Sequence, residues 1–156
     1  MKIAVIAVGN RMPGWIDDGF REYAKRMPGE ALVELVEVKP EKRSKGEPAD
    51  SVLKVEAKRL AAQLRKCRPL VVLDERGELW DTKRIAIFLQ DAMANGMHPA
   101  FVIGGADGLD DSIKIQAAYR VALSKMTLPH GLVRVILAEQ LYRGWSILQG
   151  HPYHRE

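Results

Sequence analysis

Short apolar runs alternate along this chain with longer stretches in which apolar and polar residues follow a helical period. The apolar runs, rich in β-branched residues, occupy 2–8, 31–38, 69–74, 99–105 and 119–124. The helical stretches lie at 15–27, 50–66, 82–95 and, shorter, 110–118, and a last long one extends from about His130 to Leu148. Runs of these lengths and periods are typical of buried strands and amphipathic helices. Their alternation predicts an α/β fold with a largely parallel sheet.

The loops that follow the predicted strands contain the least ordinary residues. They read "GNRMPGW", "DERGELWDT", "GGADG" and "SKMTLPHG". Ligands of parallel sheets bind beyond the carboxyl ends of the strands, so we expect the functional site at this edge. Asp50 and Thr82 are predicted N-caps, while Pro28 and Pro99 follow the expected ends of two helices.

The size of the chain, 156 residues, predicts a single compact domain over 1–156. Its one cysteine, Cys67, excludes an intramolecular disulfide and a cysteine zinc cluster. Neighbouring cations could lower the pKa of this thiol, but a tolerated surface cysteine is the preferred interpretation. The first apolar run is too short for a signal or membrane segment, which predicts a soluble, cytoplasmic protein without a membrane partner.

Positive charge is concentrated in one segment. Residues 39–68 contain ten Lys or Arg against four Asp or Glu, a local excess of +6 in a chain whose net charge is +4. A basic loop is followed by a helix with a basic face; the cations are Lys42, Arg43, Lys45, Lys54, Lys58, Arg59, Arg65 and Lys66. This segment could follow RNA phosphates, or it could be an ordinary solvated helix face. The residue pattern leaves both interpretations open.

Several short motifs are weak by themselves. The glycines of "VGNRMPG" do not form the G-x-G-x-x-G fingerprint of dinucleotide sites. In "IGGADG", residues 103–108, glycines after a strand would let a ligand approach the backbone, although a plain turn would look the same. Asp74 and Glu75 could be a catalytic carboxylate pair or part of a turn. His130 stands where the last helix begins, and a capping role is expected for it.

The last third of the chain is more distinctive. Glu139 and Arg143 are four apart in a predicted helix and should form an ion pair. Trp145 is expected to pack at a helix interface, and His151 to lead into a proline turn. His151 and His154 have the H-x-x-H spacing, but no third ligand is near in sequence, so no metal site is predicted.

Five motifs together span the whole chain: "AVGNRMPGW", "LDERGELWDT", "FVIGGADG", "LSKMTLPHGLVRVILAEQLYRGWSI" and the terminal "HPYHRE". With them the sequence resembles the RlmH family, SPOUT-class methyltransferases that act on a pseudouridine of bacterial large-subunit ribosomal RNA. One departure is "GGADG", where "GGPEG" or a close variant is usual in the family. The glycines are retained.

The resemblance implies a SPOUT-type parallel-sheet domain with a C-terminal deep trefoil knot. General rules of chain topology would not predict such a knot, because threaded chains are very rare. It also implies that the knot loops bind S-adenosyl-L-methionine, with Gly104 leaving room for the ligand. The matching positions are Leu73, Gly104, Leu123, Ser124, Lys125, Met126, Thr127 and Leu128. Leu123 and Leu128 could also be core residues.

The resemblance further implies methylation of N3 of a pseudouridine in the helix 69 loop of 23S rRNA, in the assembled ribosome, by a homodimer whose pocket is shared between subunits. N3 carries a proton, so a base or a nearby cation would assist the reaction. His154 is the preferred acceptor because imidazole titrates near neutral pH. Arg155 or Arg143 would hold phosphate or the imide oxygens, and Tyr142 would contact the base. Trp15 is a secondary candidate.

Three alternatives remain at this stage. An ordinary Rossmann-like methyltransferase would use Glu37 to hold the ribose, but its glycine signature is missing. A non-catalytic RNA-binding module of the ribosome would use the basic segment, but it would not explain the other motifs. A methyltransferase of the same fold could act on another RNA.

Overall fold

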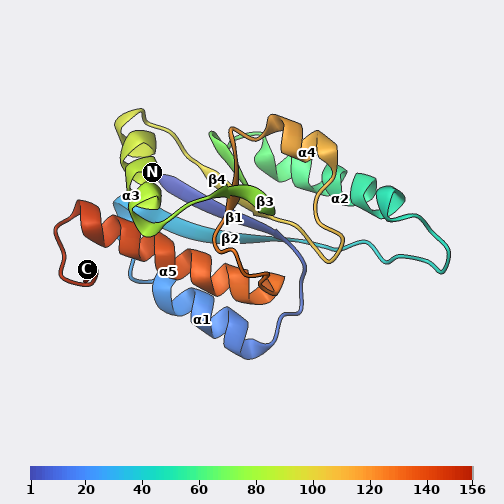
Figure 1. The fold of residues 1–156 in the computed structure, drawn as a ribbon, viewed down its shortest axis with the longest axis horizontal. Helices are drawn as coiled ribbons and strands as arrows, with labels where there is room; N and C mark the ends of the chain where they lie inside the picture. Colours follow the sequence, from blue (N-terminus) through green and yellow to red (C-terminus); the bar gives the residue numbers. More distant parts are fainter. Residues whose placement is uncertain (156) are drawn as a thin grey trace.

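The computed structural model describes residues 1–155, which form a five-stranded parallel sheet with helices on both faces (Figure 1). The strands are β1 (Lys2–Val8), β2 (Leu32–Val38), β3 (Leu70–Leu79), β4 (Ala100–Ile103) and β5 (Tyr119–Ala122). Their order across the sheet is β2-β1-β4-β3-β5. This confirms the predicted α/β class with a parallel sheet.

Side chains alternate along each strand between two hydrophobic layers. In β1, Val5 faces a core formed with helices α1 (Gly14–Ala24), α3 (Thr82–Ala94) and α5 (His130–Leu148). The next residue, Ile6, faces a core formed with α2 (Ala49–Leu64) and α4 (Asp111–Gln116). A short 3₁₀ helix, η1 (Gly29–Ala31), precedes β2. The central strands are therefore buried on both faces, which is why they read as continuous apolar runs.

The largest departure from the predicted elements is in β3. The segment "DERGELWDT" was expected to be a loop, but β3 continues through it to Leu79. After an irregularity between Leu73 and Glu78, the strand pairs again with β5. Gly77 permits this path, because a Cβ at that position would lie 2.6 Å from the backbone of Arg120 and Val121.

Two predicted helix caps were also wrong. Helix α2 begins after Pro48, two residues earlier than an Asp50 cap would allow. Helix α3 is capped by Asp81, whose carboxylate accepts a hydrogen bond from the Arg84 N–H at 2.8 Å. Thr82 instead donates its hydroxyl to Gln140 on α5 at 2.6 Å. The bounds predicted for α5 were correct.

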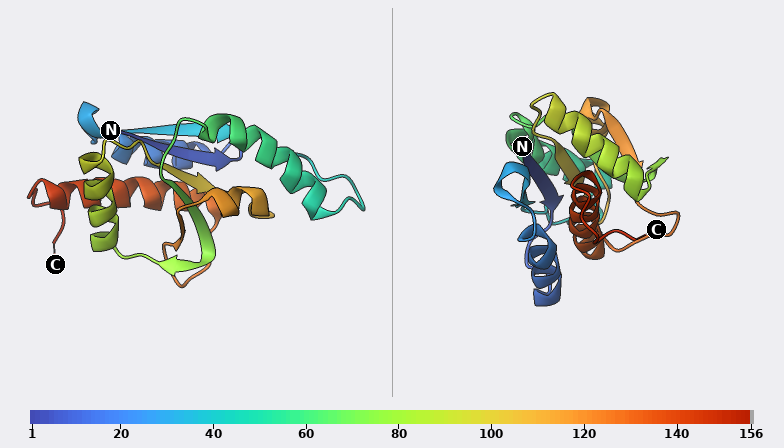
Figure 2. Two further views of the ribbon diagram at one scale, coloured as in Figure 1. Left: turned by 90° about the horizontal axis from the view of Figure 1, so that it is seen from above. Right: turned by 90° about the vertical axis from the view of Figure 1, so that its left-hand side faces the viewer.

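The molecule is elongated, with different features at its two ends (Figure 2). The loop between β2 and α2 projects beyond the carboxyl edge of the sheet, whereas the C-terminal tail lies near the far end of α5. In residues 1–155, no helix has the length and apolar character needed to cross a membrane. The trefoil knot stays a prediction of the family resemblance.

Candidate functional site

A cavity of about 650 Å³ opens at the carboxyl ends of β3, β4 and β5. Three segments form its walls: the irregular part of β3 from Leu73 to Arg76, the glycine loop 103–109 after β4, and the segment 121–130 that leads from β5 into α5. Its volume is within the range of about 300–1,000 Å³ that is usual for small-molecule sites. The cavity therefore lies at the edge of the sheet where the sequence predicted the site.

Most of the predicted cofactor residues line this cavity. They are Leu73, Gly104, Leu123, Ser124, Met126, Thr127 and Leu128. Lys125 belongs to the same segment, but it is exposed and its side chain is not part of the wall. Leu73 and Leu123 also pack against the hydrophobic core, so each of these leucines contacts the core as well as lining the cavity.

The walls combine apolar and charged surfaces. Ile103, Val121 and Leu128 supply apolar side chains, while three carboxylates, those of Asp74, Glu75 and Asp107, supply negative charge. Asp74 lies 3.8 Å from the ammonium of Lys114, and Glu75 accepts a hydrogen bond from the Thr127 hydroxyl at 3.2 Å. Asp74 and Glu75 thus lie in a strand beside the cavity, whereas their sequence was equally compatible with a turn.

Gly104 in the wall has a structural requirement besides the role expected for it. A Cβ on this residue would lie 2.6 Å from the carbonyl oxygen of Gly108 and 2.9 Å from the side chain of Leu109. These distances are far below van der Waals contact. Glycine is therefore required so that the loop can close on itself, in addition to any space it leaves for a ligand.

His130 is a cavity residue that the sequence did not identify. The cap expected there is absent: Pro129 occupies the N-cap position, and no side chain caps this helix end. The His130 ring instead lines the cavity, and its Nδ1 is buried without a hydrogen-bond partner among residues 1–155. A histidine at the start of a long helix carries no local signal for such a position.

The other predicted site residues form a cluster at the opposite end of α5. The tail folds back so that the ring of Tyr153 packs edge-on against Tyr142, with 4.7 Å between centroids. Arg143 donates to Glu139 at 2.7 Å, confirming the expected ion pair. The same guanidinium lies 4.7 Å from the Tyr153 ring centroid and donates to His154 Nδ1 at 3.4 Å. Arg155 is exposed beside this cluster.

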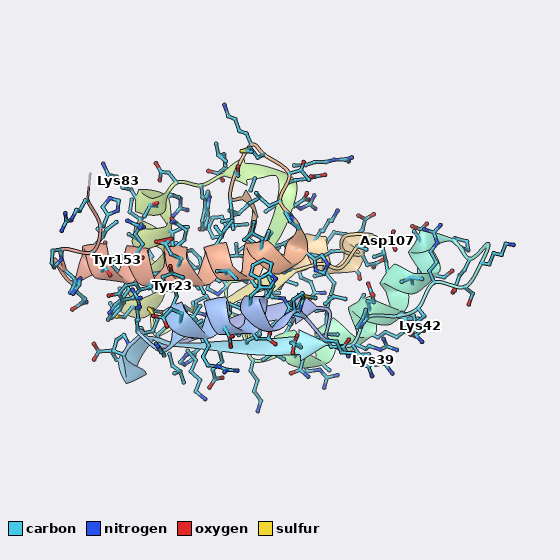
Figure 3. All side chains as sticks on the ribbon, turned by 90° about the horizontal axis from the view of Figure 1, so that it is seen from below. Tyr23, Lys39, Lys42, Lys83, Asp107 and Tyr153 are labelled. Atoms are coloured by element: carbon cyan, nitrogen blue, oxygen red, sulfur yellow. The ribbon has the colours of Figure 1, made fainter. Side chains whose placement is uncertain are left out.

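Glu139 controls the electrostatics of this tail cluster. Burial raises the pKa of the Tyr153 hydroxyl, and the Glu139 carboxylate, which accepts its hydrogen bond at 3.2 Å, raises it further. Burial is the largest single effect on Arg143 and lowers its pKa, but the hydrogen bond and charge of Glu139, together with Tyr153, outweigh it and the pKa is raised. Tyr153 is thus held neutral and Arg143 charged. Figure 3 shows Tyr153 over the end of α5, with Tyr23 of α1 nearby.

The cavity and the tail cluster are separated along α5. His130 at the start of the helix lines the cavity, whereas the tail folds back onto Glu139, Tyr142 and Arg143. This stretch of α5 corresponds to about 14–20 Å. Within one chain, the predicted catalytic residues therefore do not reach the predicted cofactor residues.

Four other residues singled out in the sequence have structural positions. Glu37, the ribose ligand of the Rossmann alternative, forms a 2.7 Å ion pair with Arg134 of α5. Trp145 is buried in the core, as expected. Trp15 is 61% exposed and lies outside the cavity wall. Burial raises the pKa of the Cys67 thiol, so the lowering that its basic neighbours suggested does not occur.

Within the described chain, no group of three or more His, Cys, Asp or Glu side chains is arranged to hold a metal ion.

Comparison with known proteins agrees with this architecture. The family model described as "Predicted SPOUT methyltransferase" matches residues 1–154. Proteins named "Ribosomal RNA large subunit methyltransferase H" from Burkholderia ambifaria and Burkholderia multivorans are 56% identical over 155 residues, covering 99% of this chain and 99% of theirs.

Solved structures show the same fold at low sequence identity. A probable methylase family protein from Haemophilus influenzae is 13% identical with a TM-score of 0.61, over 99% of this chain and 70% of that one. A probable methyltransferase from Bordetella pertussis is 14% identical with a TM-score of 0.59, over 91% and 95%. The chain therefore belongs to the SPOUT methyltransferases and, within them, to the RlmH family.

Proposed function

We propose that this protein is an S-adenosyl-L-methionine-dependent methyltransferase that methylates N3 of a pseudouridine in 23S rRNA, in the helix 69 loop of the assembled ribosome. The observation that carries the proposal is the cavity at the carboxyl ends of β3, β4 and β5, whose walls contain the family's cofactor positions. The name "Ribosomal RNA large subunit methyltransferase H", carried by relatives that are 56% identical, supports ribosomal RNA as the substrate. A single cytoplasmic catalytic domain is part of this proposal.

The cavity walls fit the proposed cofactor. Apolar side chains such as Ile103 and Leu128 suit the faces of an adenine ring, and backbone groups of the glycine loop suit its polar edges. Asp74, Glu75 and Asp107 suit the positive sulfonium and ammonium groups. When bound, S-adenosyl-L-methionine would supply an electrophilic methyl group on its sulfonium sulfur.

We place the reaction between two copies of the chain. The tail cluster lies about 14–20 Å from His130 of the cavity along α5, so one subunit's tail would complete the cavity of its partner. In a homodimer with two shared sites, the predicted cofactor residues of one subunit would meet the predicted catalytic residues of the other. In this arrangement the C-terminal tail, which lies on the surface of its own subunit, would form part of the partner's site.

The residues of the tail cluster would act on the substrate base. N3 of pseudouridine must lose a proton as it attacks, and His154 would accept it. In the isolated chain His154 Nε2 is buried and has no hydrogen-bond partner among residues 1–155, so one ring nitrogen is uncommitted. Arg143, fixed by Glu139, and Arg155 would stabilise negative charge on the imide oxygens or hold phosphate. Tyr142 would support the base from the adjacent turn of α5.

Transfer of labelled methyl groups to ribosomes that lack the modification tests this function. Label at N3 of one pseudouridine of the large-subunit RNA is the expected result, with mapping of the modified nucleotide. Label at another nucleotide would favour a methyltransferase of the same fold acting on a different RNA. Absence of both cofactor-dependent stabilisation and transfer would favour a non-catalytic RNA-binding module.

A further inference from the structure

At the end of the molecule that carries the cavity, most of the solvent-exposed charge is positive. We use the name basic arm for loop 39–48 and the exposed side of the first turns of α2. It projects beyond the carboxyl edge of the sheet (Figures 1 and 2). Residues 39–68 contain no aromatic side chain, so this part of the surface is suited to contacts through charge alone.

Three glutamates, Glu41, Glu47 and Glu56, make contacts within the basic arm that hold its conformation, whereas Asp50 is exposed. Glu41 forms a 2.6 Å ion pair with Arg59, which also donates to the backbone carbonyl of Lys39 at 2.8 Å. Buried Glu56 accepts the Glu41 N–H at 3.0 Å. Glu47 accepts the backbone N–H of Ser44 at 3.0 Å. These contacts pair the glutamate carboxylates with groups of the arm itself and fix the loop on α2.

The lysines of the arm are directed outward. Lys39, Lys42, Lys45 and Lys58 are exposed, and their side chains make no hydrogen bond or ion pair within residues 1–155. Lys54 is exposed on the same side of α2 as Lys58, because residues four apart in a helix are neighbours. Figure 3 shows Lys39 and Lys42 at the projecting end. A solvated helix face would intersperse charges of both signs, whereas here the exposed charge is mostly positive.

The basic arm adjoins the cavity. The guanidinium of Arg43 lies 3.8 Å from the carboxylate of Asp107, which belongs to the glycine loop of the cavity wall. In the same loop, a Cβ at Gly105 would lie 3.9 Å from the Glu56 carboxylate of α2. A polyanion held by the arm would therefore pass beside the cavity mouth.

We propose that the basic arm binds the phosphate backbone of the RNA next to the nucleotide that enters the cavity. This inference rests on the proposed function, because it takes RNA as the substrate. Unpaired lysines without aromatic neighbours read phosphates and not bases, so the contact is independent of sequence and sensitive to salt. The arm contributes to substrate affinity, and the methyl-transfer step does not depend on it.

The test compares two variants with the same loss of charge. Lys42→Gln/Lys58→Gln removes two cations from the arm. Lys2→Gln/Arg68→Gln removes two exposed cations at the amino edge of the sheet and serves as control. For each protein, KM for unmodified ribosomes, kcat, and the affinity for large-subunit ribosomal RNA across a salt series are measured.

The arm variant should raise KM by about tenfold near 0.1 M salt, and its salt slope should fall by about 1.4–1.8 for two lost phosphate contacts. Its kcat and its affinity for S-adenosyl-L-methionine should be unchanged. The control should match the unsubstituted protein. The inference would be overturned if the arm variant and the control had the same KM and the same salt slope. It would also be overturned if the unsubstituted protein did not bind ribosomal RNA.

Two further outcomes separate the hypotheses. If the unsubstituted protein binds ribosomal RNA through the arm but transfers no methyl group, the proposed function fails and the arm stands. If the arm variant changes the oligomeric state in light scattering, the arm is a contact between copies of the chain, and the inference fails.

Discussion

Arg134 is completely buried, and its charge is compensated by the carboxylate of Glu37 near the end of β2. Its guanidinium donates to Glu37 at 2.7 Å and to the Gly9 carbonyl at 3.1 Å. The Glu37 side chain is 36% exposed. The two partners therefore differ in what their removal leaves behind: a buried cation in one case, and a carboxylate that water can reach in the other.

This asymmetry predicts unequal effects of substitution. Glu37→Leu should lower the free energy of unfolding by about 3–5 kcal/mol, because an uncompensated charge stays buried. Arg134→Met should cost clearly less, because an apolar side chain of similar length fills the site. Urea unfolding of both variants measures the difference. Equal losses would mean that packing, and not the unpaired charge, determines stability here.

His154 and His151 lie three residues apart in the tail but differ in their contacts. His151 Nδ1 accepts the backbone N–H of Tyr153 at 3.1 Å, a local turn contact. His154 lies beside Arg143 with Nε2 uncommitted. His154→Ala should reduce kcat by roughly 10²-fold or more, the range of general-base contributions, and leave the affinity for S-adenosyl-L-methionine within about twofold. His151→Ala is the matched control. A kcat that His154→Ala does not change would remove this residue from the mechanism.

At the scale of elements, the glycine loop after β4 shapes the cavity through its own close approach. Gly104→Ala places a methyl group 2.6 Å from the Gly108 carbonyl, so the backbone of the loop must shift. We expect at least tenfold weaker binding of S-adenosyl-L-methionine, a loss of about 1.4 kcal/mol, by calorimetry. Gly14→Ala, at a position with no atom within 4 Å of the added Cβ, is the control. Comparable affinities for the two variants would show that the loop adapts.

The tail is held on α5 chiefly by the ring of Tyr153. The ring packs against Tyr142 and lies under Arg143, whereas its hydroxyl makes one hydrogen bond to Glu139. Tyr153→Phe keeps the ring contacts, so turnover should stay within about threefold, a change that corresponds to less than one hydrogen bond. Tyr153→Ala should lower turnover more than tenfold without altering cofactor affinity, because His154 and Arg155 lose their support. Similar turnover of the Phe and Ala variants would contradict this role.

Features that depend on neighbouring residues could be predicted from the sequence, whereas features that depend on contacts between distant residues could not. Helix α5 and the buried strands were predictable because periodicity and burial are local properties. The extension of β3 was not, because it depends on Gly77 meeting the backbone of β5 more than forty residues later. The cavity position of His130 is likewise a long-range result. The cofactor positions came from family motifs, and the distance between cavity and tail cluster required the fold.

At the scale of the whole molecule, its two ends carry complementary parts of one proposed site. The cavity and the basic arm lie at the carboxyl edge of the sheet, and the tail cluster lies at the other end of α5 (Figure 1). Neither end has all the groups that the proposed reaction requires. Two copies related by a twofold axis would form two complete sites, each with the cavity of one subunit and the tail of the other.

Complementation between two inactive variants tests this arrangement directly. Gly104→Val damages the cavity, and His154→Ala damages the tail; each homodimer has two defective sites. In a mixed dimer, one site combines both defects and the other combines the intact cavity of one subunit with the intact tail of its partner. After complete subunit exchange, half of the dimers are mixed and activity should recover to about a quarter of the unsubstituted level. If exchange is demonstrated by mass and activity does not recover, cavity and tail act within one chain, which would require the tail to leave its position on α5.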